Sequence, residues 1–276
     1  MTPPLNIAIT GSHGFIGRHL AQAAKDAGHR VLGLDLRAPK MPYFDTVTEG
    51  SILDSDALDR AFNGADLIVH TAAIVEEGGD RATFFSLNVD GTRAVAQAAR
   101  RAGAQRLIHL SSVMVYGFAF REGVDEADAT LMNGNAYCDS KIASEDAVRA
   151  FDQDLEVIIA RPGDVVGIGS VPWVERPLDL MRRRLFALPQ QGRGRLNPIL
   201  VQDVVKALLH LAHLKTPHPI YNVTTGASVS CADFFDRLAY AAGLSRPPRA
   251  PSGLMRSAAS LTSKIAPILN FKSPFQ

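Results

Sequence analysis

The chain has 276 residues, enough for one large α/β unit or two lobes, and its 46% of hydrophobic residues predicts a sizeable buried core. A formal net charge of +1 gives no electrostatic reason to expect nucleic acid as a partner. The two cysteines form no CxxC pair, no apolar run approaches the roughly 20 residues of a membrane span, and no signal peptide is recognisable, so we expect a soluble, cytoplasmic protein with free thiols.

Apolar runs alternate with helical patterns over the first 162 residues. The runs that predict strands are 5–10, 30–35, 66–73, 106–112 and 155–162. The segments with helical spacing are 14–28, 55–64, 92–103 and 140–151. We expect Ser55 or Asp56 to cap the second of these helices. Because the strands are continuous apolar runs, both faces of the sheet should be covered. The predicted fold class is α/β, a doubly wound parallel sheet of the Rossmann type.

The pattern changes after Pro162, where proline and glycine become frequent. We therefore predict a dinucleotide-binding domain at residues 1–165 and a small, mainly substrate-binding C-terminal lobe at 166–276. The run 198–212 predicts a strand and a helix that return to the main sheet, so that about 197–225 rejoin the first domain. The tail 254–269 has the pattern of an amphipathic surface helix.

A glycine-rich turn joins the first strand to the first helix. Gly11, Gly14 and Gly17 follow a GxxGxxG spacing, although glycine costs a helix about 1 kcal/mol relative to alanine. In a dinucleotide site one such glycine makes the tight turn, another lets the backbone approach the pyrophosphate, and a third packs the helix on the sheet. The helix N-terminus would supply amide donors to the phosphates. A plain glycine-rich turn remains the alternative.

An acidic residue closes the second strand. Asp35 lies 18 residues beyond Gly17, where a carboxylate can accept hydrogen bonds from the adenosine ribose and would repel a 2′-phosphate. This favours NAD over NADP. Arg37 could instead meet a 2′-phosphate, and a strand-end aspartate that only begins a turn is the structural alternative.

Tyr137 and Lys141 are spaced to share one face of a helix. An unperturbed tyrosine has a pKa of about 10, and we expect the ammonium group and a cationic nicotinamide to favour its phenolate. Such a tyrosine can exchange a proton with an alcohol or carbonyl. Ser112 ends a strand and could orient the substrate oxygen. The alternatives are a helix-surface pair and a loop-capping serine.

These motifs resemble those of the extended short-chain dehydrogenases/reductases. The resemblance covers about residues 5–225 and rests on "TGSHGFIG", "HTAA", "NVDGT", "SSVMVYG", "YCDSK" and "ARPGDVVG" in this order. It implies a homodimer that binds NAD and a small-molecule substrate, with Ser112, Tyr137 and Lys141 as the catalytic set and Asn88 in support. The cofactor contacts that it implies, with Ser51 in place of the family's aspartate, are Gly11, Gly14, Phe15, Ile16, Gly17, Asp35, Ser51, Ile52, Ala72, Ala73, Tyr137, Lys141, Pro162 and Val165.

Departures from the family's patterns narrow the substrate. Val113 and Met114 follow Ser112 where dehydratases carry an acid–base pair, so dehydration is disfavoured. Leu196 occupies the register in which sugar-nucleotide epimerases carry a diphosphate-binding arginine. With Asn197, these residues predict an apolar pocket. The stretches "LNPILVQDVV" and "HTAAIVEEGGDRATFFSLNVDGT" resemble the branch of the family that holds 3β-hydroxysteroid dehydrogenases and dihydroflavonol-type reductases.

The predicted function is NAD-dependent hydride transfer between nicotinamide and a secondary alcohol or its ketone, with NADP the less favoured cofactor. A nucleotide-sugar 4-epimerase with retained NAD and a dinucleotide-sensing protein remain alternatives. His70 and His109 lie in buried strand patterns, so we expect satisfied core residues and no metal site. The run Arg182–Arg184 is expected to be a solvated helix face, with an anionic substrate as the alternative.

Overall fold

The computed structural model describes residues 3–76, 79–118 and 123–251 and divides the chain into two compact units. The first unit comprises the described residues up to Gly163 together with Leu200–Val223. The second comprises Asp164–Ile199 and the described residues from Thr224 onwards. The two units divide the chain after residues 163, 199 and 223. The sequence-based boundaries were residue 165 for the end of the first domain and about 197–225 for the segment that rejoins it. The proposed tail helix 254–269 lies outside the described residues.

The first unit is built on one seven-stranded sheet in which every neighbouring pair is parallel. Its strands, in spatial order, are β11 (Ile220–Val223), β6 (Glu156–Pro162), β5 (Arg106–Leu110), β4 (Leu67–His70), β1 (Asn6–Thr10), β2 (Arg30–Asp35) and β3 (Thr46–Glu49). The order reverses between β1 and β4, which is where an open α/β sheet forms a ligand-binding crevice beyond its carboxyl ends. The predicted α/β Rossmann class is confirmed.

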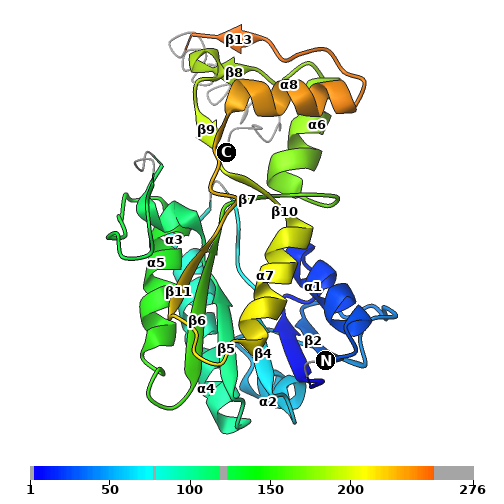
Figure 1. Ribbon diagram of the computed structural model, residues 1–276, viewed down its shortest axis with the longest axis vertical. Coiled ribbons are helices and arrows are strands. Elements are labelled where there is room, and N and C mark those ends of the chain that lie inside the picture. The colour runs from blue at the N-terminus through cyan, green and yellow to red at the C-terminus, as the bar shows by residue number, and fades with distance from the viewer. Residues whose placement is uncertain (1–2, 77–78, 119–122, 252–276) are drawn as a thin grey trace. The chain divides into compact units, whose positions relative to one another are not determined.

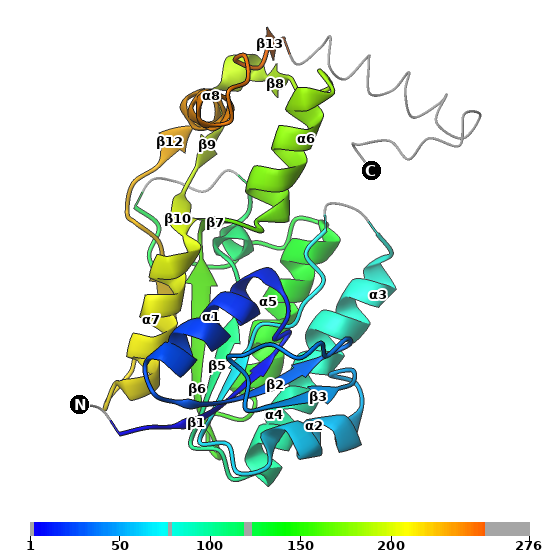
Figure 2. The same ribbon diagram turned by 90° about the vertical axis from the view of Figure 1, so that its right-hand side faces the viewer.

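Helices cover both faces of this sheet (Figures 1 and 2). One face carries α1 (Phe15–Asp26) and α7 (Val201–His213), which pack against each other. The other carries α2 (Ser55–Phe62), α4 (Gly91–Arg101) and α5 (Ala136–Arg149), beside the short α3 (Arg81–Phe85). The continuous apolar strands are therefore buried on both sides, as their sequences predict.

Several local predictions were wrong in detail. The cap of α2 is Asp54, whose carboxylate accepts from the N–H groups of Asp56 and Ala57, rather than Ser55 or Asp56. The strand β10 (Pro198–Leu200) pairs with β7 (Asp164–Val166) and does not return to the main sheet. The main sheet is instead extended by β11, which pairs with β6.

The second unit holds α6 (Arg176–Arg182), α8 (Cys231–Ala241) and short strands. Besides β7 and β10, these strands are β8 (Leu188–Pro189), β9 (Arg195–Leu196), β12 (Val229–Ser230) and β13 (Arg249–Ala250). The antiparallel pair β9–β12 and the parallel pair β8–β13 accompany a small core. Leu188, Leu196, Ala232 and Phe235 are the buried members of that core.

Candidate dinucleotide-binding and catalytic site

Each of the three glycines in the turn after β1 lacks a side chain for a different structural reason. Gly11 has φ +65°, and a Cβ on it would lie 2.8 Å from backbone atoms of Ala72. A Cβ on Gly17 would overlap the carbonyl oxygen of Gly11, so this glycine lets α1 pack on the turn. Gly14 is exposed at the N-terminus of α1 with φ −65°, and a Cβ added to it would meet only the carbonyl group of Gly11, with the oxygen at 3.1 Å. The exposed backbone of Gly14 could thus be approached by a phosphate, which a side chain at this position would hinder.

Asp35 lies at the end of β2 and connects it to the glycine turn. Its Oδ2 accepts from the N–H of His13 (2.9 Å), and its Oδ1 accepts from the N–H of Leu36 (2.8 Å). The carboxylate is half-buried, whereas Arg37 is exposed. This geometry suits a carboxylate that receives ribose hydroxyls beside the helix that would receive the phosphates.

The other predicted adenosine contacts have mixed environments. Phe15 and Ile16, in the first turn of α1, are half-buried. Ser51 Oγ accepts from the N–H of Leu53 (3.1 Å). Ile52 is 5% exposed and belongs to the hydrophobic core, where it fills the space beside the glycine that begins α4. The side chain of Ile52 is thus a core side chain, and Ala72 and Ala73, both half-buried after β4, remain available to a cofactor.

The predicted catalytic residues come together between the end of β5 and the start of α5. Ser112, two residues beyond β5, is 8% exposed and lies beside Tyr137 in the first turn of α5, close enough to influence its pKa. Asn135 caps that turn by accepting from the N–H of Cys138 (3.0 Å). Lys141, one turn further on, is 4% exposed and donates from Nζ to the carbonyl of Leu110 (2.8 Å).

Burial sets the protonation of this group. It raises the pKa of Tyr137 to about 12, and the hydrogen bond from Ser112 opposes the rise only in part. Burial also lowers the pKa of Lys141 to about 8, against the charge of Glu145. The sequence-based expectation concerned a phenolate favoured by both Lys141 and a cationic nicotinamide. In the protein alone, desolvation outweighs the effect of Ser112, and the Lys141 amine is engaged by a backbone carbonyl. The phenol is therefore protonated at neutral pH.

Asn88 connects the segments around the site. It is 1% exposed in a short π-helical turn (Ser86–Asp90). Its amide accepts from the N–H of Ile74 (2.9 Å), and donates to the carbonyl of Ile74 (3.2 Å) and to Ser140 Oγ (2.9 Å) on α5. Asn88 thus ties the loop that carries Ala72 and Ala73 to the helix that carries Tyr137 and Lys141.

A buried ion pair supports α5 and went unnoticed in the sequence. Glu145 and Arg161 are 4% and 3% exposed, and two hydrogen bonds of 2.9 and 2.6 Å join the guanidinium to the carboxylate. Arg161 Nη1 also donates to the hydroxyl of Tyr116 (2.6 Å), which hydrogen-bonds Asn222 Oδ1 (2.9 Å) on β11. The pair fixes α5 against β6 immediately before Pro162. The four-residue step from Lys141 to Glu145 was the available sequence signal.

The predicted pocket residues have other roles. Val113 is 6% exposed and packs with Val115, Tyr116 and Ile142 in a core cluster, so it forms no free wall, whereas Met114 is half-buried. The remaining predictions, Val165, Leu196 and Asn197, belong to the second unit. Leu196 lies in the core of that unit, and the backbone N–H of Asn197 donates to a carboxylate oxygen of Asp164.

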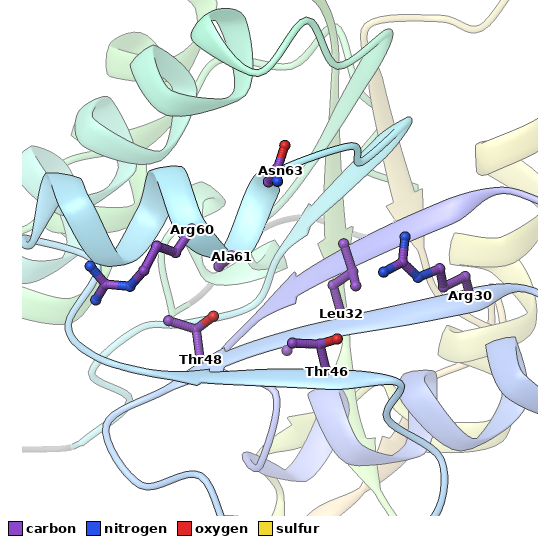
Figure 3. Close-up of a pocket in the computed structure, with 8 residues that line it drawn as sticks. Arg30, Leu32, Thr46, Thr48, Arg60, Ala61 and Asn63 are labelled. Atoms are coloured by element: carbon purple, nitrogen blue, oxygen red, sulfur yellow. The ribbon is translucent and has the colours of Figure 1, made fainter.

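Other candidate sites carry no comparable chemistry. In the described part of the chain there is no group of three metal-ligating side chains, and no helix is long and apolar enough to cross a membrane. Arg182–Arg184 are exposed. A cavity of about 140 Å³ between α2, β2 and β3 contains no predicted site residue. Figure 3 shows its two arginines, Arg30 and Arg60, on opposite sides with guanidinium groups that do not converge.

Comparisons with known proteins agree with this geometry. A family model, described as the NAD dependent epimerase/dehydratase family, matches residues 7–224. The chain belongs to the NAD-dependent epimerase/dehydratase family. Membership confirms the resemblance to the extended short-chain dehydrogenases/reductases, a family whose cofactor is NAD, and the match spans the whole first unit from β1 to β11.

The relatives of this chain include proteins named as a ceramide reductase and as a hydroxysteroid dehydrogenase. The chain is similar to a ceramide reductase of Caulobacter vibrioides (35% identity over 213 residues, 74% of this chain and 57% of the relative). It is also similar to a 3 beta-hydroxysteroid dehydrogenase/Delta 5-->4-isomerase of Mycobacterium tuberculosis (31% over 232 residues, 77% and 60%). The chain thus spans less than two thirds of the length of each of these two relatives. A solved structure of MoeE5 with UDP-glucuronic acid and NAD superposes with a TM-score of 0.78 (26% identity, 89% and 85%).

Proposed function

We propose that this protein binds NAD and transfers a hydride between it and a secondary alcohol or ketone on a mostly apolar molecule. The observation that carries the proposal is the placement of Ser112 beside Tyr137, with Lys141 buried one turn along α5. The glycine turn and Asp35 fit the dinucleotide, since the open face of Gly14 would receive phosphate and the carboxylate would receive ribose hydroxyls. When bound, the cofactor supplies or takes up the hydride at its nicotinamide ring.

The side chains handle the proton and the oxygen. Ser112 would hold the carbonyl oxygen of a ketone, and the protonated phenol of Tyr137 would give that oxygen its proton as the hydride reaches the carbon, so that an alcohol forms. The raised pKa of Tyr137 means that the phenol carries its proton at neutral pH, as the role of proton donor requires. Lys141, buried one turn along α5, would stabilise the phenolate that remains after the proton transfer and would hold the nicotinamide ribose.

Exposed apolar side chains on the segments that flank the site support an apolar substrate. Phe118, Leu131 and Met132 are 65%, 57% and 55% exposed, and all lie between Ser112 and Tyr137 in the chain. Leu131 is fixed there, since its N–H donates to the carbonyl of the residue that follows Met114 (2.8 Å). The ceramide and hydroxysteroid relatives are named for apolar substrates too.

To test the proposal, long-chain ketones, hydroxysteroids, terpenoid alcohols and UDP-sugars are supplied as substrates. Turnover of each compound is measured as the change in NADH absorbance. We expect turnover of at least one apolar compound. Tyr137→Phe should lower kcat about 10²–10⁴-fold with NAD affinity nearly unchanged. Tyr240→Phe, which removes the same hydroxyl from an 87% exposed residue on α8, is the matched control. Activity of Tyr137→Phe within about tenfold of the wild type would refute the assigned role.

A second pair of variants tests whether exposed apolar side chains near the site recognise the substrate. Met132→Gln should raise KM for the apolar substrate more than kcat changes, whereas Met41→Gln, at a 39% exposed methionine outside this segment, should leave both parameters unchanged.

A nucleotide-sugar 4-epimerase with retained NAD is the second candidate. The observation in its favour is the similarity to MoeE5, which was solved with UDP-glucuronic acid and NAD. Epimerisation produces no net NADH, so UDP-sugars are assayed separately by chromatography of the products. Turnover of a UDP-sugar with a submillimolar KM, together with inactivity on apolar alcohols and ketones, would replace the first proposal by this one.

A further inference from the structure

His70 closes β4 at the centre of the sheet and is hydrogen-bonded on both sides of its ring. The side chain is 1% exposed. Its Nδ1 lies 2.7 Å from the hydroxyl of Thr10, and its Nε2 lies 3.0 Å from the hydroxyl of Thr92. A buried imidazole whose two ring nitrogens both have buried hydroxyl partners calls for an explanation beyond core packing.

The direction of these bonds is determined by the outer partner. The Thr92 hydroxyl donates its one proton to the carbonyl of Asn88 (2.6 Å), so it can only accept from His70. Nε2 of the ring therefore carries the hydrogen. In a neutral imidazole Nδ1 is then the acceptor, and the hydroxyl of Thr10 donates to it. Burial keeps the ring neutral, because it lowers the pKa of His70 to about 3.

The two ends of this chain of hydrogen bonds belong to different parts of the dinucleotide site. Thr10 immediately precedes Gly11, and its hydroxyl also accepts, at 3.4 Å, from the N–H of Ala72. The backbones of these two loops lie close together there, since a Cβ on Gly11 would lie 2.8 Å from backbone atoms of Ala72. At the other end, Asn88 holds both the loop after Ala72 and the helix α5.

We infer that His70 is a positioning residue for the dinucleotide site, which sets the spacing between the glycine turn and the loop of residues 71–74 by accepting from Thr10. The inference rests on the NAD binding proposed above and is independent of the substrate. It makes an asymmetric prediction: the Nδ1 side of the ring should matter for NAD affinity, and the Nε2 side should matter less.

Two substitutions separate the two sides. In His70→Asn the amide oxygen replaces Nδ1 and still accepts from Thr10. In His70→Gln the amide nitrogen replaces Nε2 and keeps the bond to Thr92, while the acceptor for Thr10 is lost. By isothermal titration calorimetry we expect the Kd for NAD to rise about tenfold in His70→Gln and to stay within about twofold in His70→Asn. Thr10→Val should reproduce the tenfold rise, and combining it with His70→Gln should add little.

His109→Gln is the matched control. His109 is as deeply buried, neighbours His70 on β5 with ring centroids 5.2 Å apart, and is bonded through Nε2 to Ser144 instead of to a loop of the site. The Kd of the His109→Gln variant for NAD should stay within about twofold of the wild-type value. The substitution should lower only the free energy of unfolding. If His70→Gln does not fold, Thr10→Val carries the same prediction.

Wild-type affinity for NAD in both His70→Gln and Thr10→Val, or equal losses in His70→Asn and His70→Gln, would overturn the inference while leaving the proposed function in place. A wild-type protein that does not bind NAD would instead overturn the proposed function and, with it, the inference.

Discussion

Lowering the pH from about 7.5 to about 5 should destabilise the first unit through His70 and His109. Burial, joined by the charge of Lys141, holds the pKa of each ring far below its usual value of 6.5. The unfolded chain therefore binds more protons than the folded one as the pH falls below about 6.5, and stability present above that pH is lost. At pH 5, about 1.5 pH units below the unfolded pKa, the loss is about 2 kcal/mol for each histidine and about 4 kcal/mol for both.

The assay is urea unfolding followed by circular dichroism at both pH values, using the transition that added NAD shifts to higher urea. His109→Gln should lose about 2 kcal/mol less than the wild type between the two pH values. Other titrating groups, His29 among them, are common to both proteins and cancel in this comparison. An unchanged pH dependence in His109→Gln would refute the reasoning, since it would mean that the ring is already protonated or solvated in the folded protein.

Three further predictions concern the glycine turn, the ribose site and the ion pair. Gly17→Ala should destabilise the fold because its Cβ overlaps a backbone oxygen, whereas Gly14→Ala should fold normally and bind NAD more weakly; thermal unfolding and calorimetry distinguish the two, and equal melting temperatures would contradict the packing argument. Asp35→Asn should weaken NAD binding several-fold and narrow the preference over NADP, measured by nucleotide fluorescence; an unchanged ratio would exclude the carboxylate from cofactor selection. Arg161→Met should cost about 3–5 kcal/mol by leaving the Glu145 carboxylate buried and unpaired, and adding Glu145→Gln should recover part of that loss; no recovery would point to packing instead of charge.

The sequence predicts the elements that depend on local pattern. The continuous apolar strands and the helices between them lie where their spacing indicates, and the glycine turn with Asp35 has the geometry its spacing suggests. The edge strand β3, with the sequence TVTE, went unpredicted because it buries little and has no apolar run. The short strands β7, β8, β9, β12 and β13 were also missed, because pairings of two or three residues depend on tertiary contacts rather than on periodicity, and α8 went unpredicted.

The site shows the same division between local and distant effects. The positions of Ser112, Tyr137 and Lys141 follow from a strand end and a helical repeat. Their pKa values do not, because desolvation depends on what packs around them. Val113 and Leu196 proved to be core residues for the same reason: an apolar side chain looks alike in sequence whether it faces a substrate or the interior. His109 also departs from prediction, since its buried Nδ1 has no hydrogen-bond partner.

The way in which the chain passes between the two units affects how the protein can be made. Strand β6 needs β11 as its neighbour, yet about 60 residues separate the end of one from the start of the other. At a synthesis rate of about 5–20 residues per second, β6 waits on the ribosome for several seconds as an unpaired apolar edge, a surface prone to pairing with other chains. A chain truncated at residue 163 would lack β11 and would leave the edge of β6 permanently unpaired. Separate production of the dinucleotide-binding unit therefore calls for a short linker that joins residue 163 directly to residue 200, which retains α7 and β11.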